Sequence, residues 1–473
     1  MSLLLLLLLT ATFSARAANS FAPPTTTTTT AAWSLSHSSA PSALLLLRAG
    51  AAADAASSSS SSAWDQVPAA EPDKILGIAA NFRASTNPDK VNVCVGAYRD
   101  ASGKPWVLPT VKAAEERMLS DDGTNKEYLP IEGDSDFVKA AVQFAYGADD
   151  GDLLSNRIAA IQTLSGTGAC KIGGEFLKRY YQPPTNPEPT VYIPEPTWAN
   201  HWKIFKGCGL PTAGYRYYNR QTNQLDLDGF LEDLQNAPDE SIILLHACAH
   251  NPTGCDPTDD QWEEIRAVLK EKKHLCFFDS AYQGFASGDA ENDAGAFRRA
   301  VRSGLPCLLA QSFAKNFGLY GERVGTLSFV CTDAEQRDRV VSQLKAIVRP
   351  MYSSPPKHGS TIVKTVLADD QLTEQYKDEC KTMADRIGLM RDRLVQRLEA
   401  AGSTHDWSHV RDQIGMFAYT GMDEEMCDEL TNEYAIFLTR DGRISLAGLN
   451  EQNLDYVAGA IHKVTQGKSI TTA

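Results

Sequence analysis

Short apolar segments that alternate with helical patterns constrain the fold of this chain more than any other feature. Four segments have the length of buried strands, residues 190–194, 241–246, 275–279 and 307–312. Between the second and the third, residues 261–272 have the spacing of an amphipathic helix. Because strands that alternate with helices form mainly parallel sheets, the sequence predicts an α/β fold in which a large domain carries a mainly parallel sheet flanked by helices.

A long helical pattern near the end of the chain predicts a second domain. Apolar residues recur there at three- and four-residue spacing, at Leu372, Tyr376, Cys380, Met383, Ile387, Met390, Leu394 and Leu398. This spacing is typical of one amphipathic helix of roughly thirty residues. Because a helix of this length often joins two domains, we expect a large domain at residues 106–382 and a smaller α/β domain that combines residues 65–105 with 383–473.

Residues 1–63 differ in composition from the rest of the chain. An unbroken leucine run at residues 3–9 precedes a small-x-small cleavage pattern at residues 15–17, and runs of threonine and serine follow. Asp54 is the one acidic residue of the segment. Such a sequence cannot bury enough apolar surface to offset the entropy cost of ordering it. We expect a targeting leader that is later removed, with a disordered tail or a gene-model artefact as the alternative.

The leader resembles the two-part leaders that carry proteins into plastids surrounded by extra membranes. Its leucine run is followed by an acid-poor stretch rich in serine and threonine, and Phe21 follows a small residue as at the junction of those leaders. A mitochondrial presequence, which would carry more arginine in an amphipathic helix, is the alternative. The leucine run is too short for a permanent membrane span, so we expect a plastid protein with no membrane association in its mature form.

Charge and cysteine content narrow the classes of partner. The formal net charge is −14, which argues against nucleic acid or an anionic membrane as the main partner. The ten cysteines contain no CxxC pair. We therefore expect reduced thiols in a core, and neither a disulfide framework nor a metal site.

Polar residues follow three of the apolar segments. Asn251, in the stretch NPTG, follows the segment 241–246, Asp279 and Tyr282 follow the next segment, and Lys315 follows the last. Taken singly, such residues are typical of turns, helix caps or a solvated surface. In an open α/β sheet, however, ligands bind beyond the carboxyl ends of the strands. Their common position therefore predicts a ligand site.

These residue types match what pyridoxal 5′-phosphate (PLP) requires. The cofactor needs a lysine for its aldehyde, an acid that keeps the pyridine nitrogen protonated, donors for the ring oxygen and a phosphate site. Residues 165–168, with the sequence SGTG, precede a helical pattern, and a helix N-terminus there would present N–H donors to an anion. Simple helix capping is the alternative for this turn when it is considered alone.

Seven motifs in order resemble the aspartate aminotransferases of the class I, fold-type I PLP-dependent family, over about residues 65–465. They are VGAYR at 95–99, EYLPI at 127–131, PTWANH at 196–201, NPTG at 251–254, DSAYQGF at 279–285, SFAKNFGLY at 312–320 and GRI at 442–444. The resemblance implies that Lys315 holds the cofactor covalently and then acts as the base that moves the substrate proton. It implies that Asp279 pairs with the pyridine nitrogen and that His201 orients Asp279.

The resemblance also assigns the remaining contacts. It places Asn251 and Tyr282 on the ring oxygen and Trp198 against the ring, where Trp198 and Asn251 also face the substrate. It places the phosphate-binding residues at Gly166, Thr167, Ser312 and Arg323, with Tyr128 from a neighbouring subunit. Arg443 would bind the α-carboxylate of the substrate, and Arg349 would reach across a homodimer to the distal carboxylate. Ile75 and Gly96 would line the same pocket.

Two positions depart from the family pattern. Ser354 stands where the family has asparagine before a Pro-Pro pair, and Ala314 stands where many members have serine beside the lysine. We expect these changes to affect the rate and the phosphate contacts, and not the reaction type.

The resemblance implies aspartate aminotransferase activity, in which PLP carries the amino group from L-aspartate to 2-oxoglutarate by a ping-pong mechanism. The substrates would be dicarboxylic amino and oxo acids. The alternatives are an aromatic amino acid aminotransferase on the same scaffold, a PLP-dependent β-lyase or decarboxylase, and a non-catalytic binding protein. Arg349 argues against the lyase, because that reaction has no general need of a distal carboxylate.

Overall fold

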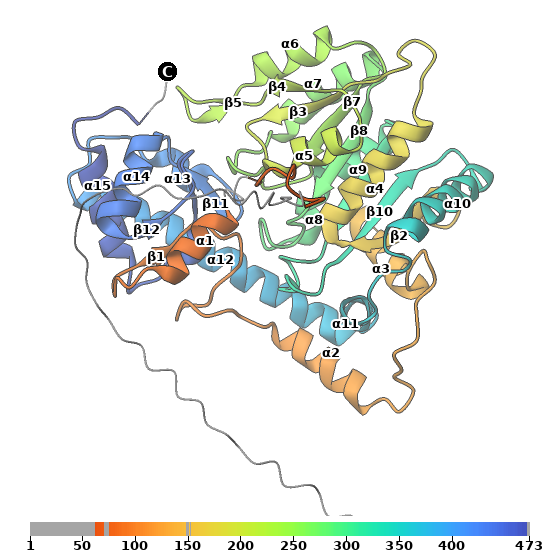
Figure 1. The fold of residues 1–473 in the computed structure, drawn as a ribbon, viewed down its shortest axis with the longest axis horizontal. Helices are drawn as coiled ribbons and strands as arrows, with labels where there is room; N and C mark the ends of the chain where they lie inside the picture. Colours follow the sequence, from red (N-terminus) through yellow and green to blue (C-terminus); the bar gives the residue numbers. More distant parts are fainter. Residues whose placement is uncertain (1–61, 71–74, 148–150, 152, 471–473) are drawn as a thin grey trace, which may run out of the picture. The chain divides into compact units, whose positions relative to one another are not determined.

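A seven-stranded sheet with the strand order β2-β10-β9-β8-β7-β3-β4 forms the centre of the fold (Figure 1). The computed structural model describes residues 62–70, 75–147, 151 and 153–470. The strands are β2 (Ile158–Leu164), β3 (Val191–Glu195), β4 (Thr212–Arg216), β7 (Ile242–His246), β8 (Leu275–Ser280), β9 (Cys307–Ser312) and β10 (Val324–Val330). β10 is antiparallel to both neighbours, and the other paired strands of this sheet are parallel. The predicted α/β fold and its four predicted strands are confirmed.

Helices cover both faces of this sheet, which explains why its strands are apolar without alternation. Leu244 and Leu245, adjacent in β7, pack into two different cores. The core of Leu244 includes residues of α4 (Ser165–Tyr180), α5 (Asn200–Gly207) and α10 (Ala334–Met351). The core of Leu245 includes residues of α3 (Ser135–Tyr146), α6 (Leu227–Asn236), α7 (Asp259–Glu271) and α9 (Gly295–Arg302). Burial on both faces holds the strand ends, and the residues that follow them, in fixed positions.

The predicted long helix is α12 (Asp370–Ala400), and all eight of its predicted apolar positions are buried. It packs in a third core with α2 (Pro109–Ser120), α11 (His358–Leu367), α14 (Glu424–Tyr434) and α15 (Leu454–Thr465). Figure 1 shows α12 running between α2 and α11 at one end and the C-terminal helices at the other. The remaining elements are α1 (Leu76–Ala84), α8 (Ala290–Asp293), α13 (Ser408–Asp412), β1 (Val91–Asn92), β5 (Tyr218–Asn219), β6 (Gln224–Leu225), β11 (Phe417–Tyr419), β12 (Ile436–Phe437), β13 (Arg443–Ser445), a π-helix (Leu153–Arg157) and a 3-10 helix (Leu446–Gly448).

The chain divides into two compact units, residues 1–69 and 70–473. In the first unit the described residues form a turn, in which the Ser62 N–H donates to the Asp65 carboxylate at 2.8 Å. Residues 1–61 of the predicted leader lie outside the described part of the chain. Because residues 70–473 form one unit, the predicted division into domains at residues 106–382, and at 65–105 with 383–473, stays a prediction.

Two further findings concern the second unit. None of the helices in the described residues combines the length and the apolar character that a membrane crossing requires. All ten cysteines of the chain are free thiols, and nine of them are buried. The prediction that the cysteines are thiols within a core is confirmed for these nine.

Candidate active site

A cavity of about 370 Å³ lies at the carboxyl ends of β7, β8 and β9. Its lining residues are Ile75, Gly96, Ser165, Gly166, Thr167, Trp198, His246, Cys248, Asn251, Asp279, Ala281, Tyr282, Ser312, Ala314, Lys315, Tyr320, Arg323, Phe417 and Arg443. The structure therefore brings together every site residue that the sequence predicted within one subunit. A second, larger cavity of about 830 Å³ has no lysine among its lining residues, and Arg299 is its one arginine. Without a lysine, this cavity cannot bind the PLP aldehyde covalently.

Lys315 lines the cavity three residues after the end of β9. Its Nζ lies 4.9 Å from the centroid of the Tyr282 ring. Burial lowers the pKa of the Lys315 ammonium, the Asp279 carboxylate partly raises it, and the charge of Arg323 lowers it further. A lysine with a lowered pKa has a larger neutral fraction at a given pH than an ordinary lysine, and the neutral amine is both nucleophile and base.

Asp279 is the penultimate residue of β8, and a chain of hydrogen bonds holds its carboxylate. His201 Nε2 lies 3.0 Å from the Asp279 carboxylate, and the Thr197 hydroxyl lies 2.9 Å from His201 Nδ1. Because an ionised carboxylate only accepts, His201 Nε2 donates to Asp279, and His201 Nδ1 faces the Thr197 hydroxyl. Burial alone would raise the pKa of Asp279, but the hydrogen bond and the electrostatic effect of His201, together with the charge of Lys315, lower it overall. Asp279 is therefore an ionised carboxylate facing the cavity.

The N-terminus of α4 lines the cavity with groups that are suited to binding an anion. Ser165 begins the helix, and its hydroxyl lies 2.8 Å from that of Ser312. A Cβ on Gly166 would lie 3.2 Å from Ser312 Cβ and 3.8 Å from an Asp279 oxygen, so a side chain here would crowd the cavity between them. Arg323 also lines this cavity. Helix N–H groups, hydroxyls and a guanidinium together are the donors that bind phosphate. At Ala314, where many family members have serine, the backbone N–H donates to Ser312 Oγ at 3.2 Å and the alanine side chain offers no hydroxyl.

Arg443, in β13, is a buried residue that lines the cavity. Nη2 donates to the Cys94 carbonyl at 3.0 Å, and Nη1 lies 3.4 Å from Asn251 Oδ1. Nε is buried and has no hydrogen-bond partner among the described residues. Burial lowers the pKa of this guanidinium. A buried arginine that lines a cavity matches a ligand carboxylate.

Phe417 and Gly96 fix the position of that guanidinium. The Phe417 ring centroid lies 4.2 Å from Arg443 Cζ, a cation–π contact. A Cβ on Gly96 would lie 2.7 Å from Phe417 Cζ, so a larger residue there would displace the ring.

Tyr128 and Arg349 lie outside this cavity. Tyr128 is 86% exposed, and Arg349 is exposed with Nη1 donating to the Ser353 hydroxyl at 2.6 Å. The cations that line the cavity are Lys315, Arg323 and Arg443. Among the described residues of one chain, the cavity therefore contains no arginine beyond Arg443 and the predicted phosphate ligand Arg323 that could bind a second substrate carboxylate.

Comparison with known proteins decides the family. The model of the family "Aminotransferase class I and II" matches residues 88–461. The chain belongs to this family. A cytoplasmic aspartate aminotransferase of Oryza sativa subsp. japonica is 50% identical over 393 residues, which cover 83% of this chain and 95% of the relative. A mitochondrial aspartate aminotransferase of Xenopus tropicalis is 47% identical over 405 residues, 86% of this chain and 94% of the relative.

A solved structure shares the fold of this class I and II aminotransferase. The aromatic-amino-acid aminotransferase of Burkholderia pseudomallei, covalently bound to pyridoxal phosphate, superimposes with a TM-score of 0.81. It is 40% identical, and the match covers 85% of this chain and all of that one.

Sequence reasoning about this aminotransferase missed three residues that shape the site. The Thr197 hydroxyl lies 3.3 Å from His246 Nε2, and both residues extend the network of polar side chains around Asp279. Burial, with the charge of His201, lowers the pKa of His246 to about 3, so His246 is neutral. Thr197 stands in a quoted motif and His246 ends a predicted strand, so both carried a signal. Phe417 carried none, because only tertiary packing places it against Arg443.

Proposed function

We propose that this chain catalyses the reversible transfer of the amino group from L-aspartate to 2-oxoglutarate, giving oxaloacetate and L-glutamate. The chain is an aminotransferase, and its cofactor is pyridoxal 5′-phosphate. One observation carries the proposal: Lys315, the ionised Asp279 and Arg443 line one cavity. The two aspartate aminotransferase relatives, at 47% and 50% identity, support aspartate as the substrate.

The residues of the cavity fit PLP. The N-terminus of α4 with Gly166, Thr167, Ser312 and Arg323 would hold the phosphate, because these groups supply helix N–H donors, hydroxyls and a positive charge. The close approach of Gly166 to Ser312 leaves the backbone open to an anion.

The ring of the cofactor would contact a second group of residues. Asp279 would pair with the pyridine nitrogen, Asn251 and Tyr282 would donate to the ring oxygen, and Trp198 would cover one face of the ring. Bound PLP supplies an electron sink that stabilises negative charge at the substrate Cα. His201 and Thr197 keep Asp279 oriented, and the ionised state of Asp279 favours a protonated ring nitrogen.

Lys315 is the residue that moves the proton. As a neutral amine it would accept the proton from the substrate Cα and hold it as an ammonium group, and its lowered pKa favours the neutral form. Arg443 binds the α-carboxylate and so fixes the Cα above this base. Ile75, Gly96 and Phe417 line the same cavity and exclude water from it.

The distal carboxylate of the substrate requires a second subunit in this proposal. The protein would be a twofold dimer in which Arg349 and Tyr128 enter the neighbouring cavity, Arg349 for the distal carboxylate and Tyr128 for the phosphate. Their exposure, and their absence from the cavity of their own chain, support this arrangement.

A substrate panel tests the proposed activity. The main alternative is an aromatic amino acid aminotransferase. The Burkholderia structure, which is 40% identical to this chain, is named for that activity. With 2-oxoglutarate as acceptor, we expect kcat/KM for aspartate to exceed that for phenylalanine by at least about 100-fold, since one charge-paired group contributes several kcal/mol. Equal values for the two substrates would favour the aromatic alternative, and release of ammonia or CO₂ would favour a lyase or a decarboxylase.

We further propose that residues 1–63 direct the protein to an organelle, the plastid, with the mitochondrion as the alternative. The composition of the segment and the mitochondrial name of one relative support an organellar form. A fluorescent fusion of residues 1–70 should enter the plastid, and protein that begins at Trp64 should retain full activity. A diffuse cytosolic signal would contradict the targeting proposal.

A further inference from the structure

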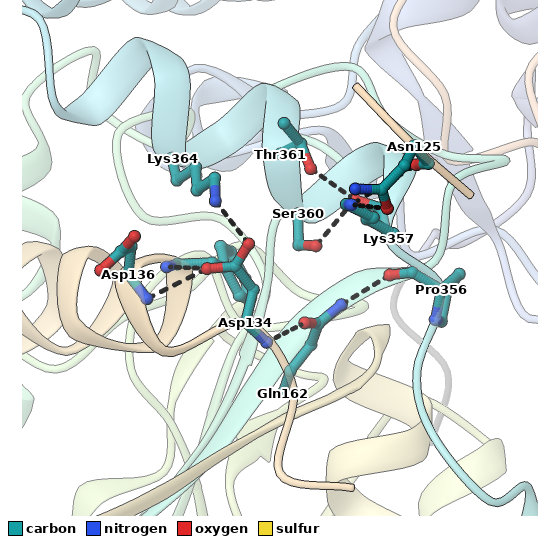
Figure 2. A network of polar contacts seen from close by, with 10 residues as sticks. Asn125, Asp134, Asp136, Gln162, Pro356, Lys357, Ser360, Thr361 and Lys364 are labelled. Carbon is teal, nitrogen blue, oxygen red and sulfur yellow. Dashed lines mark hydrogen bonds and ion pairs between the residues drawn. The ribbon is translucent and has the colours of Figure 1, made fainter. Parts of the chain in front are cut away.

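The two segments that carry Tyr128 and Arg349 meet at one buried side chain, Gln162 of β2. The segment 121–134 carries Tyr128 and leads into α3, and residues 349–357 carry Arg349 and Ser354. Gln162 accepts a hydrogen bond from the Asp134 N–H at 3.1 Å and donates to the Pro356 carbonyl at 2.8 Å. Figure 2 shows this amide lying between the two segments. The orientation of the amide follows from its partners, since one is a donor and the other an acceptor.

The packing around Gln162 leaves its side chain little freedom. Gln162 is fully buried, and its backbone N–H donates to the Glu132 carbonyl at 2.8 Å. A Cβ on Gly133 would lie 2.2 Å from Gln162 Cβ, so Gly133, at φ +98°, is pressed directly on the side chain. A buried amide with both of its polar ends bonded holds its partners in one relative position.

Further polar contacts join the same two parts of the chain. Lys364 Nζ lies 2.6 Å from the Asp134 carboxylate, and Lys357 Nζ lies 3.0 Å from Asn125 Oδ1 (Figure 2). The second contact is exposed and the first only partly buried, so solvent and salt weaken them more than the bonds of Gln162. Residues 121–128 are exposed throughout, so packing within this chain contributes little to their position.

We propose that Gln162 is a positioning residue that holds Tyr128 and Arg349 in the geometry with which they enter the neighbouring subunit. This inference rests on the proposed function, in which both residues act across the dimer. Gln162 touches neither substrate nor cofactor, and its loss damages the partner's site more than its own. In its own chain Gln162 lies only three residues before Ser165, but backbone pairing of β2 with β10 keeps that strand in place without the Gln162 side chain.

Two purified hybrid dimers with different affinity tags test this. In the cis hybrid, one chain carries Gln162→Met and the other Lys315→Ala, so the single working site has the altered residue in the chain that supplies Lys315. In the trans hybrid, one chain is unchanged and the other carries both substitutions, so the altered chain supplies only Tyr128 and Arg349. A general loss of stability affects both hybrids equally, because they contain the same substitutions. Their difference therefore reports positioning alone.

We expect the trans hybrid to lose about ten- to 100-fold in kcat/KM for aspartate, mainly through KM, because misplacement by about 1 Å has effects of this size. The cis hybrid should change by less than about threefold. The dissociation constant of succinate, an unreactive dicarboxylate, should rise in the trans hybrid alone, and PLP should dissociate faster there. Equal losses in the two hybrids, or no loss in either, would overturn the role of Gln162. If Gln162→Met fails to assemble, Gln162→Asn allows the same comparison.

A parallel pair of hybrids with Arg349→Asp in place of Gln162→Met separates this inference from the proposed function. If Arg349→Asp inactivates in trans and not in cis, the shared site stands, and the Gln162 result is judged by itself. If Arg349→Asp inactivates only in cis, the shared site fails, and the inference about Gln162 fails with it.

Discussion

Replacing Lys315 by alanine is expected to abolish amino-group transfer and the visible absorbance of the covalently held cofactor. The substitution removes both the amine that holds the cofactor and the base that moves the substrate proton. General acid–base catalysis alone contributes about 10²–10⁴-fold. Turnover of aspartate should therefore fall by about 10⁴ or more in a stopped-flow or coupled assay, while PLP is still retained without a covalent bond by the phosphate and ring contacts.

Lys381→Ala is a suitable control, because Lys381 is an exposed lysine paired with Asp385 at 2.9 Å and lies outside the cavity. It should leave both the absorbance and the turnover unchanged. Normal turnover in Lys315→Ala would show that another group is the base.

Replacing Arg349 by aspartate is expected to reduce kcat/KM for aspartate by about three orders of magnitude. Leaving one member of a buried charge pair without its partner costs about 2–5 kcal/mol, and the new negative charge adds repulsion. Activity on neutral amino acids should fall far less, because they have no distal carboxylate. Equal losses for all substrates would show that Arg349 is structural.

Mixing the two inactive variants should restore activity. If Lys315→Ala and Arg349→Asp chains are unfolded and refolded together, random pairing makes about half of the dimers hybrid. In each hybrid one site receives both defects, and the other combines an intact Lys315 with an intact Arg349 from the partner. About a quarter of all sites should then work, and the activity should return to about that fraction of the wild-type value. A mixture that stays inactive, with hybrids confirmed by mass spectrometry, would refute the shared site.

Local patterns predicted the elements of this fold well. Four strands were placed to within one residue at each end, because a run buried on both faces is apolar without interruption. The helix α12 was predicted from a spacing that its burial confirms. The spacing of apolar residues on one face of a helix or strand depends only on residues that are close in sequence, so it can be recognised from the sequence alone. The strand β10 was not predicted, since its antiparallel place between β2 and β9 depends on residues far from it.

Some residues of the site could likewise be predicted from the sequence, whereas others could not. Lys315, Asp279 and Asn251 follow strand ends, and parallel strands bring such residues to one edge of a sheet. Phe417, by contrast, lies in a short strand whose contact with Arg443 depends on the packing of the C-terminal elements.

The sequence by itself determined the α/β class, the strand ends that meet at the cavity and, through its motifs, the reaction to be expected. Only the tertiary structure decided which side chains hold those groups in place. Gln162 is one polar residue in an otherwise ordinary strand, and its partners lie 28 and 194 residues away along the chain. Burial makes such a group form hydrogen bonds, but the fold alone determines which donor and acceptor lie within reach.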